Sequence, residues 1–390
     1  MTVKFHLAED TIDQKDIDRL IAWLRTYPRL TKGAVTQEFE QRWSELLGCR
    51  YSVSCNSGSS ANLLMYYALM LSGRPRNKKV IVPSVGWVTT IAPGIQFGFE
   101  PIMREADPDT FGLDLNHLES LLKQHNASTV VLVHVLGIPH KMDAMMALKE
   151  KYGFILLEDA CAAIGAAYRG RKVGTFGDMA SFSFYFGHQM STIEGGMVSA
   201  DDKRFSDLLL MLRSHGWSKD LDAETHEALV NQYEVDDFHT PFVFYEPGFN
   251  LRSTDLNAYI GLGQLEKLDR MTSCRQENHA RYMKHLGDKF YVQRCEPGCQ
   301  IASIHFGLVA QSVEHRRSIV RALVQNGIET RIFSAGNLGL HPFWSNRYGK
   351  ASFAVADRIH HCGLFLPNNP SLKPEHIDFI SNVVLEAAWQ

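Results

Sequence analysis

Two polar segments of the sequence each follow a short apolar run and carry groups that bind charged ligands. Ser57, Gly58 and Ser59 stand where an expected strand gives way to an expected helix. Backbone amides at a helix start, with hydroxyl groups beside them, favour an anion such as phosphate. Glu158 and Asp159 close an apolar run, and a carboxylate at a strand end can hold a protonated ring nitrogen. A capping serine or a capping carboxylate would explain either segment alone.

Two further segments carry polar side chains that could bind a ligand or take part in catalysis. The strand-like run 181–186 leads through a polar turn to His188 and then to the glycine turn at 194–196. A single histidine in such a turn is more often packed or surface-exposed than catalytic. Asn250 and Arg252 precede a long amphipathic pattern and could simply cap that helix. Each of the four segments therefore has an ordinary structural explanation when it is taken alone.

The elements that must position these residues alternate between strands and helices. Short apolar runs predict the strands, and apolar residues spaced by three and four predict the helices. This alternation is typical of an α/β fold with a mostly parallel sheet between helices. The expected strands lie at 51–54, 80–82, 129–135, 154–157, 180–186 and 196–200. The expected helices lie at 16–24, from 58 onward, and at 115–123, 142–151 and 254–269.

The sequence pattern changes twice after the last of these expected strands. The polar, acidic stretch 220–240 has few apolar anchors and is expected to be a long excursion or a mobile loop. After about residue 270 the expected elements become shorter. We therefore expect a large domain over residues 1–265 and a smaller C-terminal α/β domain over residues 266–390.

Composition excludes several classes of protein. The chain of 390 residues has 40 Lys and Arg against 43 Asp and Glu, a balance that argues against nucleic-acid or membrane-surface binding. The seven cysteines contain no CxxC pair, so we expect a reducing, cytoplasmic setting and no metal site. No apolar run of about 18 residues or signal-peptide pattern is visible. No GxGxxG follows an early strand, which disfavours an NAD-linked Rossmann enzyme.

Taken together, the four segments resemble the sugar aminotransferase (DegT/DnrJ/EryC1/StrS) family of fold-type-I pyridoxal phosphate enzymes, which act on nucleotide-linked keto sugars. The resemblance runs from about Thr31 to Leu366 and implies an aspartate-aminotransferase-like fold. It also implies a homodimer with shared active sites and a cofactor bound in the large domain. The matching motifs lie at 82–87, 158–161, 181–184, 194–196, 254–258, 260–262 and 264–268.

The resemblance also implies roles for individual residues toward the cofactor. Asp159 would pair with the pyridine nitrogen and keep it protonated, so that the ring acts as an electron sink. Trp87 would stack on the ring, and Asn250 would reach the phosphate from the partner subunit. The implied cofactor-binding residues are Gly58, Ser59, Trp87, Asp159, Ser183 and Asn250.

His188 stands where the family has the lysine that links the cofactor covalently. An imidazole cannot form that link, so pyridoxal phosphate or pyridoxamine phosphate would be held non-covalently. This change resembles the GDP-4-keto-6-deoxy-D-mannose 3-dehydratase branch, which supplies deoxysugars for lipopolysaccharide O-antigen. A sister branch with histidine carries an iron–sulfur cluster, but no cysteine lies between Cys161 and Cys274 to hold one.

The chemistry implied by this branch is loss of the C3 hydroxyl from the sugar. His188 would act as the base, ammonia would be released, and L-glutamate would restore pyridoxamine phosphate. His215 could assist from the partner subunit, or could simply bond a carbonyl at a helix end. Ala162 and Gly187 depart from the expected pattern, since an acidic residue and a more polar one are usual there.

The sequence leaves the substrate and two alternative functions open. Candidate substrate contacts in the smaller domain are Arg331, Ser334, Asn337 and His341. They could serve a GDP, dTDP or CDP sugar, with GDP-4-keto-6-deoxy-D-mannose favoured by the resemblance. The alternatives are a nucleotide-sugar aminotransferase with a Lys-to-His change and a non-catalytic, cofactor-binding relative.

Overall fold

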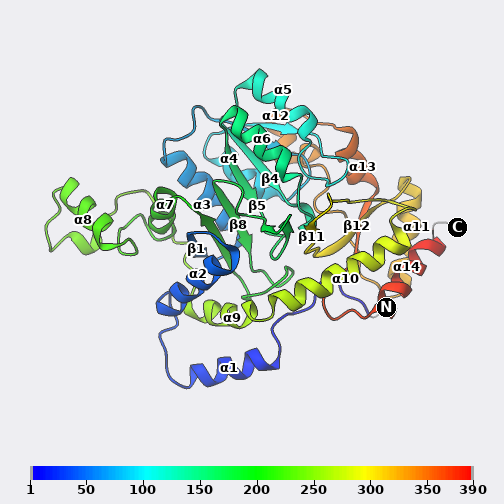
Figure 1. Cartoon of the computed structure of the whole chain (residues 1–390), viewed down its shortest axis with the longest axis horizontal. Helices are drawn as coiled ribbons and strands as arrows, with labels where there is room; N and C mark the ends of the chain where they lie inside the picture. Colours follow the sequence, from blue (N-terminus) through cyan, green and yellow to red (C-terminus); the bar gives the residue numbers. More distant parts are fainter. Residues whose placement is uncertain (1–2, 388–390) are drawn as a thin grey trace.

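The computed structural model describes residues 3–387 and is built around a seven-stranded sheet (Figure 1). The strand order is β1-β9-β8-β5-β4-β2-β3, and within this sheet only β9 runs against the others. The mostly parallel sheet predicted from the sequence is therefore confirmed. Its strands are β1 (Tyr51–Cys55), β2 (Lys79–Pro83), β3 (Glu100–Arg104), β4 (Thr129–Val133), β5 (Ile155–Asp159), β8 (Met179–Ser183) and β9 (Gly196–Ala200).

Helices cover both faces of the sheet because consecutive residues of its central strands are apolar, so that both faces of the sheet are apolar. Val80 and Val82 belong to a core with α3 and α7, whereas Ile81 belongs to a separate core with α5 and α6. The large-domain helices are α1 (Gln14–Leu24), α2 (Ala34–Leu47), α3 (Gly58–Leu71), α4 (Ala92–Gln96), α5 (Leu115–His125), α6 (Met142–Tyr152), α7 (Lys203–Arg213), α8 (Ala223–Gln232) and α9 (Asp255–Leu265).

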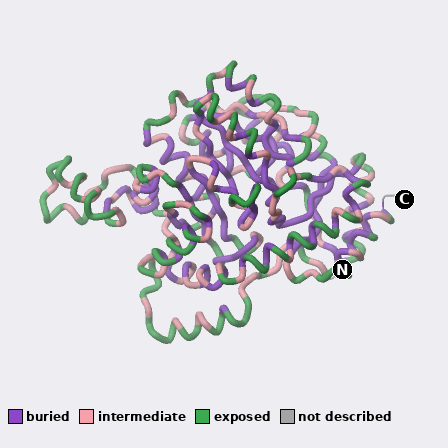
Figure 2. The backbone as a smooth tube through the Cα atoms, in the orientation of Figure 1, coloured by how far each residue is buried: buried purple, intermediate pink, exposed green. Residues whose placement is uncertain are grey.

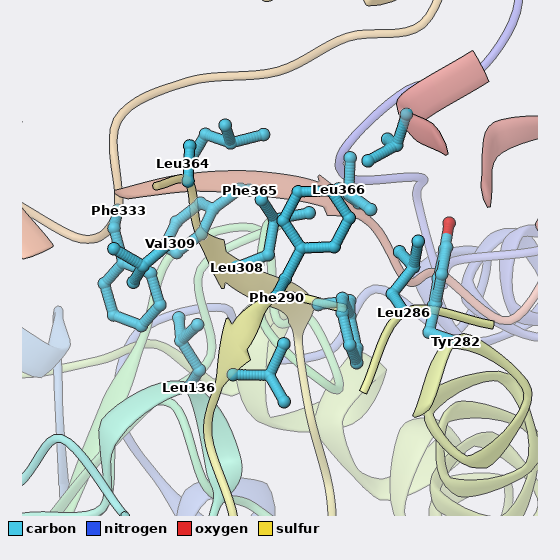
Figure 3. Close-up of a cluster of buried hydrophobic side chains, with 14 of the residues drawn as sticks. Leu136, Tyr282, Leu286, Phe290, Leu308, Val309, Phe333, Leu364, Phe365 and Leu366 are labelled. Carbon is cyan, nitrogen blue, oxygen red and sulfur yellow. The ribbon is translucent and has the colours of Figure 1, made fainter. Parts of the chain in front are cut away.

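The C-terminal part of the chain builds a second sheet, in the order β10-β12-β13, with helices around it. Its core is rich in leucine and phenylalanine, including Leu308, Phe333 and Phe365 (Figure 3). The elements are α10 (Leu268–Leu286), β10 (Tyr291–Val292), β12 (His305–Val309), α11 (Val313–Gln325), α12 (Pro342–Tyr348), α13 (Ala354–Cys362), β13 (Gly363–Pro367) and α14 (Pro374–Ala387). The domain boundary that we predicted at residues 265 and 266 falls at the turn between α9 and α10.

Short elements complete the chain between these units. A small sheet joins β11 (Cys299–Gln300), β6 (Ala167–Tyr168) and β7 (Arg171–Lys172). Four 3₁₀ turns lie at Val88–Thr90, Val135–Gly137, Thr240–Phe242 and Leu338–Leu340.

Three sequence expectations differ from the structure. The predicted helix 254–269 is two helices, because the chain turns at residues 266 and 267 before α10 begins. The acidic excursion contains α8, which Asp222 caps by accepting from the Thr225 amide. Strand β3 was missed because its residues are only half apolar and contain a proline. Figures 1 and 2 show α8 and its flanking loops projecting from the body with mostly exposed residues.

Two features that residues 3–387 lack bear on function. Over residues 3–387, no helix is long and apolar enough to cross a membrane. The same residues contain no group of three or more His, Cys, Asp or Glu side chains placed to hold a metal ion.

Candidate active site

A cavity of about 490 Å³ opens at the carboxyl ends of β5 and β8, where the two sheets meet. The large domain contributes the start of α3 and the loop after β8, which carries His188. The smaller domain contributes His305 and Arg331, and the N-terminal segment contributes Leu7. Ligands of open α/β sheets bind at such strand ends.

Asp159, the last residue of β5, is buried and lines this cavity, and both oxygens of its carboxylate accept hydrogen bonds. Asn62 donates to Oδ2 at 3.0 Å, and Thr90 donates to the same oxygen at 2.6 Å. The Cys161 amide donates to Oδ1 at 3.1 Å. Ser181 in turn donates to the Asn62 oxygen at 2.7 Å, which fixes the orientation of that amide. Three donors therefore fix the position of this carboxylate at the end of β5, where a ring nitrogen bound in the cavity could meet it.

Glu158, the neighbouring carboxylate, has a different role. It is fully buried and does not line the cavity. His134 lies 2.9 Å from Oε2, and the amides of Gly174 and Gly177 donate to the two oxygens. Burial by itself raises the pKa of Glu158, but the hydrogen bonds from His134 and the two glycines lower it overall. This carboxylate therefore anchors the loop behind the sheet, and neither carboxylate caps the next helix.

The start of α3 forms a cradle with hydroxyl and amide groups. Ser57 caps the helix by accepting from the Ser60 amide, while Gly58 and Ser59 line the cavity. A Cβ atom at Gly58 would lie 2.5 Å from Cβ of Ser183, so only glycine permits this close approach of α3 to β8. The cradle, the Asp159 carboxyl group and the half-exposed ring of Trp87 line one cavity, and this set of groups fits a phosphorylated pyridine cofactor.

His188 lines the same cavity, and its Nδ1 atom is buried without a hydrogen-bond partner among the described residues. Burial lowers the pKa of His188 to about 4, and the charges of Arg275 and Arg331 lower it while that of Asp159 opposes them. No lysine lines the cavity in the described part of the chain. The imidazole is therefore neutral at physiological pH and can accept a proton.

The four predicted substrate contacts divide into two pairs. Arg331 and Ser334 line the cavity, and Ser334 donates to the Gly86 carbonyl at 2.8 Å. Asn337 does not line it, because its buried amide donates to the Asp357 carboxylate and accepts from the Gly339 amide. His341 does not line it either.

The ring of His341 is occupied elsewhere. Its Nε2 atom lies 2.8 Å from the Ala335 carbonyl. Asn337 and His341 thus stabilise the loop after Arg331 and lie outside the cavity, and their contact with substrate stays a prediction.

Asn250 and His215 also lie outside this chain's own cavity. Asn250 is exposed and pairs with Ser214 in an isolated bridge, and the His215 ring packs 5.1 Å from that of Trp217. Arg252 does not cap α9, since Thr254 does so, but instead donates to Ser214 at 2.9 Å.

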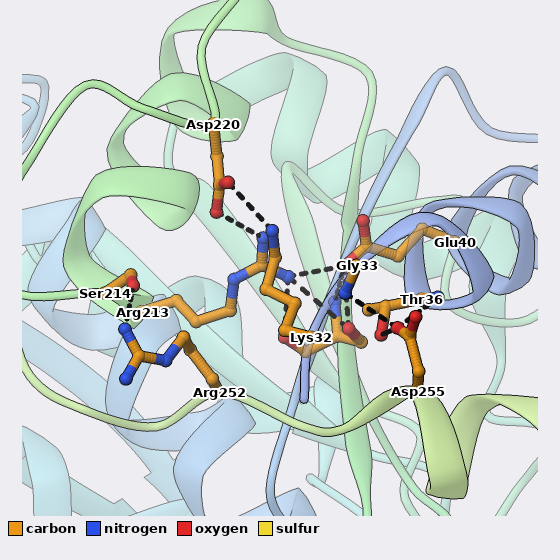
Figure 4. Close-up of polar contacts among 10 residues, drawn as sticks. Lys32, Gly33, Thr36, Glu40, Arg213, Ser214, Asp220, Arg252 and Asp255 are labelled. Atoms are coloured by element: carbon orange, nitrogen blue, oxygen red, sulfur yellow. Dashed lines mark hydrogen bonds and ion pairs between the residues drawn. The ribbon is translucent and has the colours of Figure 1, made fainter. Parts of the chain in front are cut away.

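An ion-pair cluster fixes the segment that carries His215 and Asn250 (Figure 4). Buried Arg213 pairs with Glu40 and, at 3.1 Å, with Asp220, which also pairs with Lys32 at 2.8 Å. Asp255 accepts from the Gly33 amide, which ties α9 to the start of α2. The segment is therefore held rigidly with Asn250 facing outward.

Sequence reasoning missed several residues of the site. Asn62 and Thr90 hold Asp159, and His305 lines the cavity from the smaller domain with an unpartnered Nδ1. Asn62 could have been found, because a polar residue on the apolar face of α3 needs a buried partner. Thr90 and His305 had no such pattern around them.

Known proteins with related sequences agree with this geometry. The model of the DegT/DnrJ/EryC1/StrS aminotransferase family matches residues 10–385. The chain belongs to this family. Within it, the chain is similar to a GDP-4-keto-6-deoxy-D-mannose 3-dehydratase of Yersinia pseudotuberculosis, with 32% identity over 340 residues that cover 86% of each protein.

Solved structures of family members are also similar. One is a GDP-4-keto-6-deoxymannose-3-dehydratase variant, with a histidine replaced by asparagine and GDP-perosamine bound. It matches with a TM-score of 0.90 and 28% identity, over 98% of this chain and 100% of that chain. Another structure of that dehydratase holds a trapped PLP–glutamate geminal diamine, with a TM-score of 0.88 and 28% identity over the same shares.

Proposed function

We propose that this chain is a pyridoxamine phosphate-dependent 3-dehydratase of a nucleotide-linked 4-keto-6-deoxy sugar, with GDP-4-keto-6-deoxy-D-mannose as substrate. The observation that carries the proposal is His188, which lines a cavity suited to the cofactor in which no described residue is a lysine. The family membership and the dehydratases among its similar relatives support it. They do not favour the alternatives, an aminotransferase or a non-catalytic relative.

Different residues of the cavity would bind different parts of the cofactor. Gly58, Ser59 and Ser183 would hold the cofactor phosphate, and Trp87 would cover the ring. Asp159 would hold the pyridine nitrogen in its protonated form. When bound, the cofactor supplies an amine for the sugar ketone and a ring that withdraws electrons.

His188 has the role of a base. With the cofactor bound, its neutral ring nitrogen would accept the proton that the reaction releases, and the resulting imidazolium would be able to return a proton. Histidine suits this step because it cannot capture the cofactor as a lysine would. Arg331 lines the cavity as a cation for the negatively charged groups of the nucleotide sugar or L-glutamate.

We further propose a homodimer in which Asn250 and His215 serve the partner's cavity. Asn250 is exposed. Two aromatic residues of the preceding loop are also largely exposed to solvent, Phe238 at 86% and Phe242 at 69%. Contiguous exposed aromatic side chains favour a protein contact. All seven cysteines are free, which supports a cytoplasmic location.

Product identification tests the proposed activity. Purified protein loaded with pyridoxamine phosphate should be mixed with L-glutamate and a panel of GDP-, dTDP- and CDP-linked 4-keto-6-deoxy sugars. We expect ammonia and a 3-deoxy ketone from the GDP-linked mannose derivative. An amino sugar as product would instead establish the aminotransferase, and no turnover of any sugar would leave the non-catalytic relative.

A further inference from the structure

Arg275, on α10, is a buried guanidinium without a carboxylate partner. The residue is 2% exposed, and none of the described ion pairs involves it. Its hydrogen bonds go only to backbone carbonyls, and its Nε atom has no partner among the described residues. Burial lowers the pKa of Arg275 to about 10, so it remains charged at neutral pH. A buried charge without a counter-ion is costly and calls for a reason.

The carbonyls that Arg275 binds come from both sides of the active-site cavity. Nη2 donates to the carbonyl of His188 at 3.4 Å, and Nη1 donates to that of Ile304 at 3.1 Å. Ile304 directly precedes His305, the second histidine of the cavity. Nη1 also donates to the carbonyl of Asn368, just after β13. One guanidinium group therefore joins the loop of His188 to the two central segments of the smaller domain.

A neighbouring side chain makes a parallel connection without a charge. Gln189 donates from one amide nitrogen to the carbonyls of Ala162 and Ala302, both at 2.6 Å. Gln189 thus already ties the loop of His188 to the segment before β12. What Arg275 adds beyond a second tether is a full positive charge.

The positive charge of Arg275 opposes several negative groups around His188 that would favour protonation of its imidazole. Asp159 at the end of β5 favours a protonated imidazole, and Glu194 and Glu329 also line the cavity. A bound cofactor adds a phosphate, whose negative charge acts in the same direction. Arg275 and Arg331 oppose them, and His305 is neutral because burial holds its pKa well below the usual value. Arg331 is exposed, so solvent weakens its effect relative to that of the buried Arg275.

We propose that Arg275 is a positioning residue that fixes the backbone of His188 and holds its imidazole in the neutral, proton-accepting form. Its value to catalysis rests on the proposed role of His188 as the base. The electrostatic effect itself can be measured without turnover, because the His188 ring titrates whether or not it is a base.

The experiment is a proton-NMR pH titration of holoenzyme labelled with ¹³C at histidine Cε1. The His188 signal is assigned by its loss in His188→Asn. We expect Arg275→Met to raise the His188 pKa by about one pH unit, a tenfold gain in proton affinity. Arg275→Lys keeps the charge, so the pKa should stay within about 0.3 of wild type while kcat falls roughly tenfold from the lost carbonyl contacts.

Two further variants keep the test decisive. Arg275→Gln also removes the charge but keeps a donor, and it reports the same rise if the methionine variant does not fold. His279→Gln is the matched control, because His279 is buried one turn later on α10 and lies outside the cavity. An unchanged His188 pKa without the charge, or an equal rise in the lysine or His279 variant, would overturn the proposal. If His188→Asn retains full turnover, the base assignment fails independently of this result.

Discussion

The Thr90 hydroxyl donates a hydrogen bond to Oδ2 of Asp159 at 2.6 Å. The bond is buried and its acceptor is a carboxylate, so it belongs to the stronger class of hydrogen bonds. It holds the one acid at the carboxyl end of β5 that faces the cavity.

Replacing Thr90 with valine should therefore weaken cofactor binding. The change keeps the shape and removes a charge-assisted donor, which corresponds to about 1.5 kcal/mol, or roughly a tenfold rise in Kd for pyridoxamine phosphate. Fluorescence titration of apoprotein measures this. Thr129→Val is the matched control, since the buried Thr129 hydroxyl has no described partner and its loss should leave Kd unchanged.

Substitutions at His188 should separate binding from turnover. His188→Asn should bind the cofactor with an unchanged Kd and lose at least about 10²-fold in kcat, because a general base contributes 10²- to 10⁴-fold. His188→Lys should form a covalent link to pyridoxal phosphate that borohydride traps, visible as a mass increase. Full activity in the asparagine variant would contradict the role of His188.

The sequence predicted the residues of this site whose place is set by local structure. Gly58 and Asp159 lie at a helix start and just after a predicted strand, and such positions follow from hydrophobic periodicity, whereas Ser183 was inferred from the family resemblance alone. The positions of Asn337 and His341 outside the cavity could not be predicted, because their partners Asp357 and Ala335 are set by tertiary packing.

Some secondary-structure elements were also missed, because they too depend on tertiary packing rather than on local sequence. Strand β3 and the turn at residues 266 and 267 were missed because neither leaves a periodic pattern that local propensity can read. The fold class followed from the alternation of strands and helices, which depends on many residues and survives such local errors.

Acid should destabilise the protein through its buried neutral histidines. Burial lowers the pKa values of His188 and His279 to about 4, below the unfolded value near 6.5. The unfolded state therefore binds more protons, and the stability present above pH 6.5 is lost as the pH falls toward 4. We expect a loss on the order of 1 to 3 kcal/mol for each histidine.

Urea unfolding of apoprotein at several pH values measures this loss. Buried carboxylates with lowered pKa values act in the same direction, so the histidine contribution is isolated by comparison with His279→Gln. That variant should show a shallower decline between pH 6.5 and 4. A decline identical to that of wild type would refute the contribution of His279.

Arg331 and His341 should respond differently to substitution. Arg331→Met removes a cation from the cavity and should raise KM for the nucleotide sugar or for L-glutamate at least about tenfold. His341→Ala should leave both KM values within about twofold and lower stability by about 1 kcal/mol through the lost bond to Ala335. Steady-state kinetics and urea unfolding give the two readouts, and a large KM change in the His341 variant would restore it to the substrate site.

Mixed dimers should reveal whether Asn250 serves the partner's cavity. His188→Asn and Asn250→Ala should each be nearly inactive as homodimers. In a heterodimer of the two, one cavity carries both changes and the other carries neither, so activity should return to about half that of wild type per heterodimer. Differently tagged subunits allow the heterodimer to be purified. Absence of recovery would place Asn250 in its own chain's site or outside catalysis.

The cavity takes its walls from residues as far apart in sequence as Leu7 and Phe365. A growing polypeptide therefore has no complete reaction chamber until the ribosome has added the last of these residues. Turnover requires nearly the whole chain, although the residues of this chain proposed to hold the cofactor all lie within residues 58–183. For the same reason, a proteolytic fragment that ends after the seven-stranded sheet would still lack the wall of the chamber that His305, Arg331 and Phe365 help to form.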